Sequence, residues 1–328
     1  MKAIICEAHN GPESLQLREV PDPIPRPGQA LIQIHAAGVN YADAMMRRGL
    51  YPRTPDPPHR LGIEGCGIVE AVGDGVTEFK PRDRVMALLR GPDMGGYAEK
   101  AVAEVRHMLP LPDALSMEEG GAFPNVFFTA YGCLKLCGNL EAGQTALIHA
   151  AGGGVGTAAV QLAKAWGARV IATAGSDEKL AKVRELGADE TINYRTEDFT
   201  PRVGELTEGR GVDFVLDSVG GETFEKSYRL LAPFGRLITV GIASRTPNTV
   251  ESPSLLFHAW GVLGFHMNAY DSKPGLLRRA LDEMLPLLNG GKIRPIIGHR
   301  FPLEDAAEAH RLLESRESYG KILLLPHA

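Results

Sequence analysis

A run of small residues, 150–156 (AAGGGVG), constrains the fold of this 328-residue chain more than any other stretch. It lies between a β-type run, 145–149, and a helix-type run, 157–166. Read from Ala151, the motif is A-x-G-x-x-G, so the first glycine of the strict G-x-G-x-x-G form is absent. A strand that turns through small residues into a helix lets a pyrophosphate sit at the helix N-terminus, where free N–H groups and the helix dipole favour negative charge. Because the strand and the helix flank the motif as it requires, we predict a dinucleotide-binding domain rather than a structural glycine loop.

The end of the next β-type run, 168–175, bears on the choice of dinucleotide. Folds that prefer NAD carry an acidic residue here, which accepts hydrogen bonds from the ribose hydroxyls. This chain has Ala174 instead, followed by Ser176 and, one turn later, Lys179. A hydroxyl and a cation suit a 2′-phosphate, although Ser176 also suits the cap of a helix that begins at Asp177. We therefore predict NADPH as the cofactor in preference to NADH.

Composition excludes several other classes of protein. The net charge is −5 and no basic cluster occurs, which argues against a nucleic-acid partner. No run approaches the roughly 18 apolar residues of a membrane span, and the first residues lack a secretory apolar core. The four cysteines have no spacing typical of a disulfide framework. We expect a soluble, cytoplasmic protein with reduced thiols.

The rhythm of the sequence predicts two domains. Residues 1–123 contain short β-type runs separated by proline and glycine turns, which is typical of an all-β region. Residues 124–262 alternate β-type and helix-type runs, the pattern of a doubly wound parallel sheet. The last segment, 263–328, has β-type runs without βαβ partners of their own. We expect it to complete the sheet of the first region, so that 1–123 and 263–328 form one discontinuous domain.

Two features of the later chain add to this prediction. An amphipathic helix is expected over 273–288, followed by β-type runs at 295–301 and 321–326. The run 259–265 (AWGVLGF) is predicted to be an apolar strand at the edge of the parallel sheet. An unpaired sheet edge invites pairing with another chain, and a two-fold contact is the commonest closed solution. We therefore expect a homodimer, the alternative being an internal strand covered by C-terminal helices.

Seven stretches in order along the chain carry a family resemblance. They are GVNYADAMMRRGLYP (38–52), GIEGCGIVEAVGDGV (62–76), GGYAEKAV (95–102), HAAGGGVGTAAVQLAKAWGARVIATAGS (149–176), GADETINYR (187–195), DSVGG (217–221) and YGKILLLP (319–326). In these seven stretches the chain resembles the zinc-free quinone oxidoreductase (zeta-crystallin-like) branch of the medium-chain dehydrogenase/reductase superfamily. The resemblance implies an α/β fold, in which a doubly wound Rossmann nucleotide domain (124–262) accompanies a mostly β, GroES-like catalytic domain.

The chain departs from the alcohol dehydrogenases of that superfamily at their catalytic zinc. Their Cys, His and Cys ligands fall here at Asn40, Ile63 and Asn125. Zinc takes thiolate, imidazole or carboxylate ligands, and isoleucine supplies none. We therefore expect no metal. Without a Lewis acid to favour an alkoxide, reduction of a conjugated acceptor such as a quinone or enone is expected rather than oxidation of an alcohol.

The resemblance also assigns cofactor contacts. Backbone N–H groups of the glycine motif would meet the pyrophosphate, a second group would surround the 2′-phosphate, and a third would line the nicotinamide. In that order they are Gly153, Gly154 and Val155; Ser176, Lys179, Tyr194 and Arg316; and Thr129, Ser218, Gly241 and the backbone around Phe265, His266 and Met267. Gly156 would allow close packing of the helix. The alternative for Lys179 and Arg316 is an ordinary solvated charge.

The substrate pocket is expected where the zinc ligands would be. Asn40 is expected to donate a hydrogen bond from its amide to a developing oxyanion. Tyr51 is the candidate for a positioned phenol, with packing of its ring against a loop as the alternative. Tyr41 and Asn125 are expected to wall the pocket, and Glu64 to lie beneath it.

Three functions are compatible with these features. The favoured one is an NADPH-dependent quinone or enone reductase. The second is a reductase of α,β-unsaturated acyl thioesters (an enoyl reductase), whose longer substrate would use a basic neighbourhood formed by Arg47, Arg48, Arg53 and Arg60. The third is a non-catalytic nucleotide-binding protein with a structural or RNA-associated role.

Overall fold

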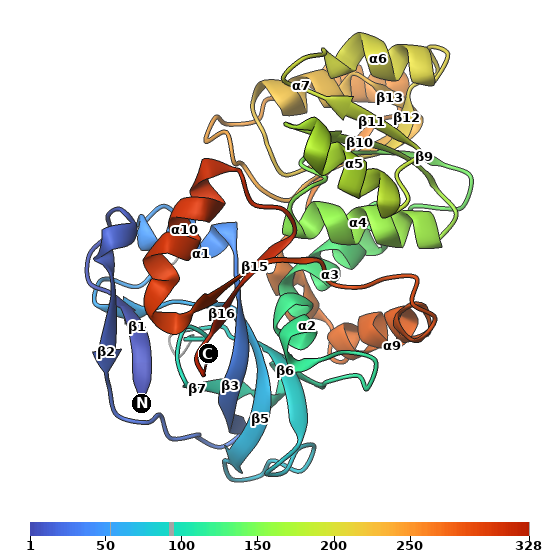
Figure 1. Ribbon diagram of the computed structural model, residues 1–328. Coiled ribbons are helices and arrows are strands. Elements are labelled where there is room, and N and C mark those ends of the chain that lie inside the picture. The colour runs from blue at the N-terminus through green and yellow to red at the C-terminus, as the bar shows by residue number, and fades with distance from the viewer. Residues whose placement is uncertain (53, 92–94, 328) are drawn as a thin grey trace. The chain divides into compact units, whose positions relative to one another are not determined.

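The computed structural model describes residues 1–52, 54–91 and 95–327, and the chain divides into two compact units (Figure 1). The first, called the β unit, consists of Met1–Asn125 and Pro295–Ala328. The second, called the α/β unit, consists of Val126–Arg294. The β unit is therefore discontinuous in sequence.

Two sheets form the framework of the β unit. Its strands are β1 (Lys2–Cys6), β2 (Leu15–Glu19), β3 (Gln29–Val39), β4 (His59–Arg60), β5 (Glu64–Val72), β6 (Arg84–Leu88), β7 (Lys100–Glu104), β8 (Met108–Pro110), β15 (Ile297–Pro302) and β16 (Lys321–Leu325). The larger sheet has the order β15-β16-β3-β5-β6-β8, and β7 also pairs with β3. The smaller, antiparallel sheet has the order β2-β1-β4.

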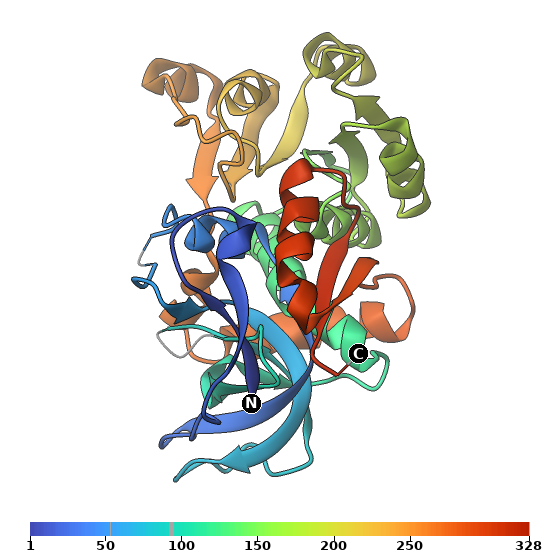
Figure 2. The same cartoon turned by 60° about the vertical axis from the view of Figure 1, so that its left-hand side comes forward.

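The C-terminal strands complete the larger sheet, as predicted. β16 pairs antiparallel with β3, and β15 pairs parallel with β16. The helices of this unit are α1 (Tyr41–Arg47), α2 (Met117–Ala122) and α10 (Ala306–Ser315). Helix α10 runs beside β15 and β16 in both ribbon views (Figures 1 and 2).

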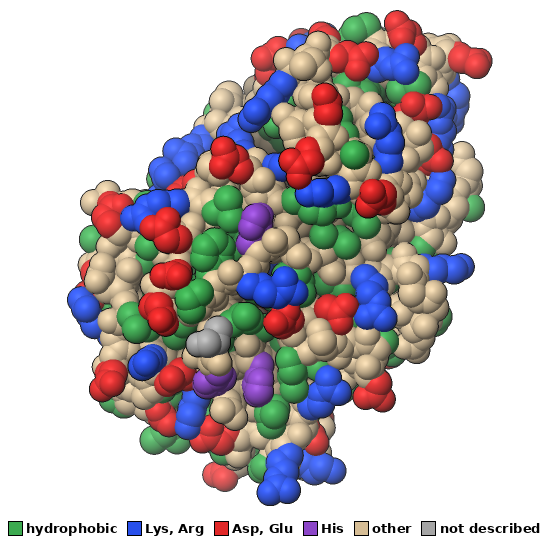
Figure 3. Space-filling view, viewed as in Figure 1, with side chains coloured by type: hydrophobic (Ala, Val, Ile, Leu, Met, Phe, Trp, Pro, Cys, Tyr) green, Lys and Arg blue, Asp and Glu red, His purple; other side chains and the backbone are tan. Residues whose placement is uncertain are grey.

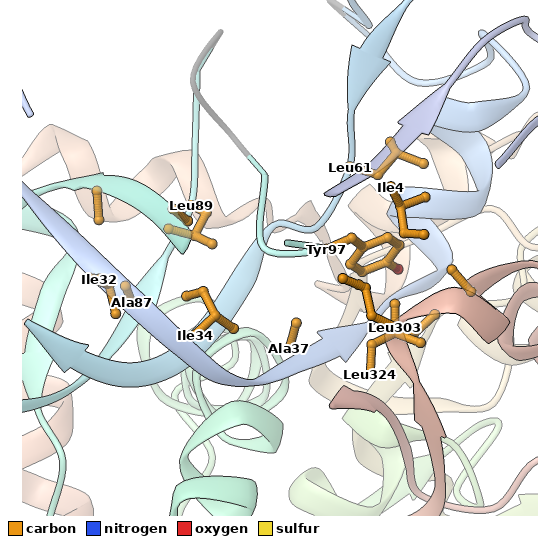
Figure 4. Packing of buried hydrophobic residues seen from close by; sticks show 14 of the residues in the cluster. Ile4, Ile32, Ile34, Ala37, Leu61, Ala87, Leu89, Tyr97, Leu303 and Leu324 are labelled. Atoms are coloured by element: carbon orange, nitrogen blue, oxygen red, sulfur yellow. The ribbon is translucent and has the colours of Figure 1, made fainter. Parts of the chain in front are cut away.

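The core of the β unit follows from alternation along its strands. Ile32 and Ile34 of β3 are buried, whereas Gln33 between them is exposed. Figure 4 shows how segments far apart in the sequence meet in this core: Ile4, Leu61 and Tyr97 from the first part of the chain lie close to Leu303 and Leu324 from its end. Burial of these side chains is what holds the C-terminal segment in the β unit.

The α/β unit has a six-stranded sheet whose pairings are all parallel. Its strands are β9 (Thr145–Ile148), β10 (Arg169–Ala174), β11 (Glu190–Asn193), β12 (Val212–Asp217), β13 (Leu231–Thr239) and β14 (Gly261–Gly264). The order β11-β10-β9-β12-β13-β14 corresponds to 3-2-1-4-5-6, the order of a Rossmann fold. In such sheets a nucleotide binds beyond the carboxyl ends of the strands, at the point where the order reverses, which is here between β9 and β12.

Helices connect the parallel strands. They are α4 (Gly154–Ala165), α5 (Asp177–Glu185), α6 (Phe199–Leu206), α7 (Glu222–Tyr228) and α8 (Ser252–His258). Helix α9 (Leu276–Asn289) follows the last of these strands, and α3 (Pro124–Tyr131), before the first, continues into a π-helix (Gly132–Cys137). All residues of β9 are buried, as expected for a parallel strand covered on both faces. Helix α9 corresponds to the helix predicted over 273–288 and begins three residues later. Within the described ranges, no helix combines the length and apolarity needed to cross a membrane.

The predicted return of the chain to the first domain at residue 263 is too early. Residues up to Arg294 belong to the α/β unit. The Tyr270 hydroxyl donates to the carbonyl oxygen of Phe128 at 2.8 Å, and the Phe265 ring packs so closely on Gly132 that a Cβ there would overlap it. These contacts within the α/β unit hold the segment, and no β-type pattern in the sequence signals them.

Candidate active site

The glycine motif forms a tight turn between β9 and α4. Ala150 has a φ of +49°, and the N–H of Ala151 donates to Thr173 of β10 at 2.9 Å. Gly153 is the N-cap residue of α4 and has no side chain to cap it. The first N–H groups of the helix are therefore without a capping side chain, as the helix terminus of an anion site requires.

Two glycines of the motif meet different surroundings. A Cβ added at Gly156 would overlap the carbonyl oxygen of Ala150 and lie 2.6 Å from Cα of Ala151. A Cβ added at Gly153 would meet only the Ala150 oxygen, at 3.4 Å, which is ordinary contact. Gly156 is thus required by the packing of helix on turn, whereas Gly153 leaves an open approach to the helix N-terminus. This cradle fits a pyrophosphate.

Ser176 and Lys179, two members of the predicted 2′-phosphate group, follow the end of β10. The Ser176 hydroxyl accepts the N–H of Lys179 at 3.3 Å, so Ser176 does cap α5 at Asp177. The stem of Lys179 passes over the motif, because a Cβ at Gly152 would lie 3.2 Å from Cδ of Lys179. The Lys179 side chain therefore lies beside the glycine motif.

Tyr194 and its neighbour Arg195 approach Gly175 from β11. A Cβ at Gly175 would lie 2.7 Å from the Tyr194 hydroxyl and 3.2 Å from Nε of Arg195. The sequence pattern predicts Tyr194 but not Arg195, which brings a second cation beside Gly175. Arg316 lies in the β unit, exposed and in the left-handed conformation at the end of α10. Its predicted phosphate contact stays a prediction.

The residues expected around the nicotinamide follow the next strands of the sheet. Ser218 comes directly after β12, and a Cβ at Gly241 would lie 3.2 Å from its carbonyl oxygen. Buried Asp217 accepts the N–H groups of Val219 and Gly220, which fixes this loop. Desolvation raises the pKa of Asp217, and these N–H donors oppose the rise. Thr129 on α3 is buried.

The segment after β14 has its larger side chains directed inward. Phe265 and Met267 are buried, while His266 accepts the N–H of Asn268 and so caps a 3₁₀ turn (Met267–Ser272). The prediction for this segment concerned its backbone, and it stays a prediction.

A buried polar cluster lies in the β unit. Nζ of Lys321 is 2.7 Å from Oε1 of Glu64, and neither side chain is more than 3% exposed. The same Nζ donates to Oδ1 of Asn40 at 2.7 Å and to the Val39 carbonyl at 3.1 Å. The ammonium therefore has three acceptors for its three N–H groups, which offsets the cost of burying it.

The Asn40 amide is saturated within this cluster. Its Nδ2 donates to Oε1 of Glu64 at 2.8 Å and to the Gly38 carbonyl at 3.2 Å. Its Oδ1 accepts from Lys321 and, at 2.8 Å, from Nδ2 of Asn125. Both N–H groups are taken, so the prediction that Asn40 donates to a substrate oxygen is not supported. Asn125 is half-buried, and its backbone N–H is held by Oε2 of Glu64 at 2.7 Å.

Asp43 connects this cluster to the start of α1. Its carboxylate accepts the N–H of Asn40 at 2.9 Å and that of Gly62 at 3.2 Å, and Tyr97 also donates to it. The side chain is fully buried, and desolvation raises its pKa to about 6. The N–H of Asn40, the charge of Lys321 and the Tyr97 hydroxyl oppose that rise, while Glu64 adds to it.

A chain of hydrogen bonds continues from Asp43 to α10. Arg47 can only donate, so its bond to Nδ1 of His310 at 3.2 Å makes that nitrogen an acceptor. Nε2 of His310 then carries the proton and donates to the Tyr97 hydroxyl at 3.2 Å. Burial lowers the pKa of His310 to about 3, and the nearby Arg47 acts in the same direction. His310 is therefore a neutral residue within the structural hydrogen-bond chain.

Two of the arginines predicted to form a basic neighbourhood, Arg47 and Arg48, are engaged in ion pairs. Arg47 is fully buried and forms an ion pair with Glu314 at 2.8 Å, and Arg48 pairs with the same carboxylate at 2.6 Å. Arg53 lies outside the described residues. On the face shown in Figure 3, acidic and basic side chains are interspersed. A groove of free arginines is thus not formed by Arg47 and Arg48.

Tyr51 shows the ring packing that was the alternative interpretation, and its role as a donor to substrate stays a prediction. Its ring packs against the core of the β unit. Burial raises the pKa of its phenol, to which the Asp43 carboxylate adds while Arg90 opposes, so the hydroxyl stays protonated at neutral pH. Tyr41 is the first residue of α1, directly after Asn40.

The donor set does not fit a catalytic zinc ion. Asn40 and Asn125 offer neutral amides that are bonded to each other, and Ile63 packs its side chain against the core. Among the residues that the structure describes, no three His, Cys, Asp or Glu side chains come together to hold a metal. The cation that contacts Asn40 and Glu64 in this cluster is the Lys321 ammonium.

The comparisons with known proteins cover almost the whole chain. The family models "alcohol dehydrogenase GroES-like domain" and "zinc-binding dehydrogenase" match residues 26–113 and 154–285. Quinone oxidoreductase of Pseudomonas aeruginosa is 40% identical over 330 residues, covering 99% of each chain. The synaptic vesicle membrane protein VAT-1 homolog of Rattus norvegicus is 33% identical over 99% of this chain and 84% of its own length.

A solved structure agrees with the sequence comparison. Escherichia coli quinone oxidoreductase complexed with NADPH superposes with a TM-score of 0.93 at 34% identity, over 99% of this chain and 100% of that one. The predicted Rossmann and GroES-like fold is confirmed. The chain therefore belongs to the medium-chain dehydrogenase/reductase superfamily, within which it is a quinone oxidoreductase-like enzyme.

Proposed function

We propose that this protein reduces a quinone or another conjugated carbonyl compound with NADPH and without a metal ion. The observation that carries the proposal is the polar cluster of the β unit. At the positions where alcohol-oxidising relatives hold zinc, this chain has two linked amides and an isoleucine. Hydride addition to a conjugated acceptor places negative charge on oxygen, which hydrogen-bond donors can stabilise without a Lewis acid.

The α/β unit would hold the cofactor. The glycine cradle at the start of α4 would receive the pyrophosphate, and Ser176, Lys179, Tyr194 and Arg195 would surround the 2′-phosphate. NADPH, when bound, supplies the hydride. The chain's own task is to fix the cofactor through the helix N-terminus and the loops after β12 and β13, and to present donors to the acceptor's oxygen.

A screen of NADPH oxidation tests the proposal. The acceptors are 1,4-benzoquinone, 9,10-phenanthrenequinone, a simple enone and crotonyl-CoA, each assayed with NADPH and with NADH. We expect turnover of a quinone or the enone, faster with NADPH. Turnover of crotonyl-CoA alone would assign an enoyl reductase instead, and activity on none of the four would favour a non-catalytic role.

Metal content gives a second test. We expect less than about one-tenth equivalent of zinc in the purified protein and no loss of activity with chelators, because amide and isoleucine side chains do not form a zinc site. Stoichiometric zinc held by three protein ligands would contradict the mechanism.

We also propose that the protein is a homodimer joined through β14. This strand lies at the edge of the parallel sheet, and Leu263 on it is 41% exposed. Leu256 and Phe257 of the preceding helix α8 are 78% and 81% exposed. Unpaired edge strands and clustered apolar side chains favour association.

Light scattering at micromolar concentration tests the dimer. A mass near the 35.3 kDa of one chain would contradict it. If a dimer is found, Leu263→Glu should weaken it by placing like charges together, and Val262→Pro should dissociate it or prevent folding by removing a ladder donor. A dimer that neither change affects would have its interface elsewhere.

A further inference from the structure

The charges of Lys321 and Glu64 determine how the Asn40 amide is oriented. An ammonium can only donate, so the atom of Asn40 that faces Lys321 at 2.7 Å is the carbonyl oxygen. A carboxylate accepts, so the atom that faces Glu64 at 2.8 Å is the NH₂ group. The reverse orientation would place N–H against ammonium and oxygen against carboxylate. The ion pair therefore locks this amide.

The fixed orientation of the Asn40 amide determines in turn the orientation of the Asn125 amide. Oδ1 of Asn40 has its second lone pair toward Asn125 at 2.8 Å, so the Asn125 atom there is Nδ2. The backbone of Asn125 is anchored independently, because its N–H donates to Oε2 of Glu64 at 2.7 Å. Asn125 is thus held at two points by the same cluster.

Of the side-chain N–H groups of Asn40 and Asn125, one has no acceptor among the described residues. Asn40 uses both N–H groups and both lone pairs within the cluster, and it is 6% exposed. Nδ2 of Asn125 has two hydrogens, and among the described residues only one is engaged, by Asn40. Asn125 is also the more exposed of the two. The second N–H is therefore free to meet a ligand.

We infer that the free amide N–H of Asn125, aimed by the Lys321–Glu64–Asn40 cluster, donates to the carbonyl oxygen of the acceptor. The inference deepens the proposed function and rests on it. Hydride from NADPH adds to the acceptor carbon, the displaced π electrons move to the oxygen, and a proton from solvent completes the hydroquinone or saturated ketone, leaving NADP⁺. Asn125 stabilises the charge on the oxygen, while Lys321, Glu64 and Asn40 are positioning residues.

A chromophoric enal tests the contact without turnover. 4-(Dimethylamino)cinnamaldehyde absorbs at longer wavelength when a donor polarises its carbonyl oxygen. Its spectrum is recorded on the NADP⁺ complex of the wild-type protein, Asn125→Ala and Asn125→Asp. Both variants keep the backbone N–H to Glu64 but lose the amide donor. Asn289→Asp, at the exposed end of α9, is the matched control, and Tyr51→Phe tests the competing donor.

We expect a red shift in the wild type, Asn289→Asp and Tyr51→Phe proteins, and its loss in both Asn125 variants. In turnover with the enone, kcat should fall by roughly 10²–10³ in the Asn125 variants, as for other single oxyanion donors, with a smaller change in KM. The red shift should weaken in Lys321→Met, where Asn125 stays but its orientation is no longer fixed.

Several results would overturn the inference. A shift retained in Asn125→Ala, or lost in Tyr51→Phe alone, would assign the donor to another group. An enal that binds by calorimetry without any shift would show that no donor reaches its oxygen, while turnover could still uphold the proposed reductase. An absence of both binding and turnover would overturn the proposed function and this inference with it.

Discussion

The two units of the molecule position their candidate functional residues by opposite means. In the α/β unit the main elements are backbone groups and missing side chains: a helix start without a capping side chain, and a glycine of α4 that packs closely against the turn before it. In the β unit the main elements are buried charges, with Lys321 and Glu64 fixing two amides. The first means depends on residues adjacent in sequence. The second depends on residues that only the fold brings together.

This difference implies different sensitivities to mutation. A cradle made of backbone tolerates changes to nearby side chains but not the addition of a Cβ at a close contact. A buried ion pair tolerates replacement of both partners by neutral groups far better than the loss of one, because the remaining charge stays desolvated.

Lys321→Met should have the largest effect. It leaves the Glu64 carboxylate buried without its cation, and we expect a loss of about 3–5 kcal/mol in the free energy of unfolding. Adding Glu64→Gln should recover much of it, since no uncompensated charge then remains. The matched control is Lys182→Met on α5, whose ion pair with Glu178 at 2.7 Å is exposed and should contribute no more than about 0.5 kcal/mol. Urea unfolding measures all three, and equal losses for the two lysines would contradict the role of Lys321.

Asp43 should make stability depend on pH in the β unit. Burial raises the pKa of this carboxyl from 3.8 to about 6. Between these values the folded protein binds more protons at this site than the unfolded chain does, so the free energy of unfolding falls as pH rises from about 4 to 6, by at most about 1.4 kcal/mol for each pH unit. Asp43→Asn should remove this contribution. The difference between the urea unfolding curves of wild type and variant isolates it, and a wild type that gains stability relative to the variant over this range would contradict the raised pKa.

The sequence predicted the α/β unit better than the β unit because of the same difference. The glycine motif, the parallel strands and the edge position of β14 follow from local patterns. Lys321 and Glu64 are separated by 257 residues, and no spacing rule connects them. The predicted donor role of Asn40 failed for this reason, since its saturation depends on Lys321.

Two other predictions were wrong for similar reasons. The chain stays in the α/β unit until Arg294 because of contacts by Phe265 and Tyr270, which leave no periodic pattern. The sequence predicts Arg47 in a basic neighbourhood. Its partners Glu314 and His310 lie at the other end of the sequence, and the fold buries Arg47 against them. Charge type is visible in a sequence, whereas burial of a charge depends on distant partners.

Lys179→Ala should weaken the binding of NADPH much more than that of NADH. A lysine beside the glycine cradle can contact the 2′-phosphate, which NADH lacks, and such a charge-assisted hydrogen bond contributes roughly 1.5–3 kcal/mol. We expect the Kd for NADPH to rise between about tenfold and more than a hundredfold, with that for NADH nearly unchanged. Lys182→Ala, one turn further along α5, is the control. Equal losses for both cofactors would show that Lys179 acts on the structure of the turn.

Two glycine substitutions separate packing from binding within the cradle. Gly156→Ala places a methyl group against the backbone of Ala150 and Ala151, which cannot move aside as a flexible side chain would. We expect it to lower the free energy of unfolding by about 1–3 kcal/mol, as overpacking does, and to weaken NADPH as the turn shifts. Gly153→Ala meets only ordinary contact, so its stability should change by less than about 1 kcal/mol. Its methyl group would nevertheless stand in the approach to the helix N-terminus and weaken NADPH and NADH alike. Thermal unfolding without cofactor and fluorescence titration with each dinucleotide give the two quantities. If Gly153→Ala bound both dinucleotides as the wild type does, the pyrophosphate would have to bind elsewhere. The α/β unit would then not bind its ligand through backbone groups, and the contrast with the charged cluster of the β unit would not hold.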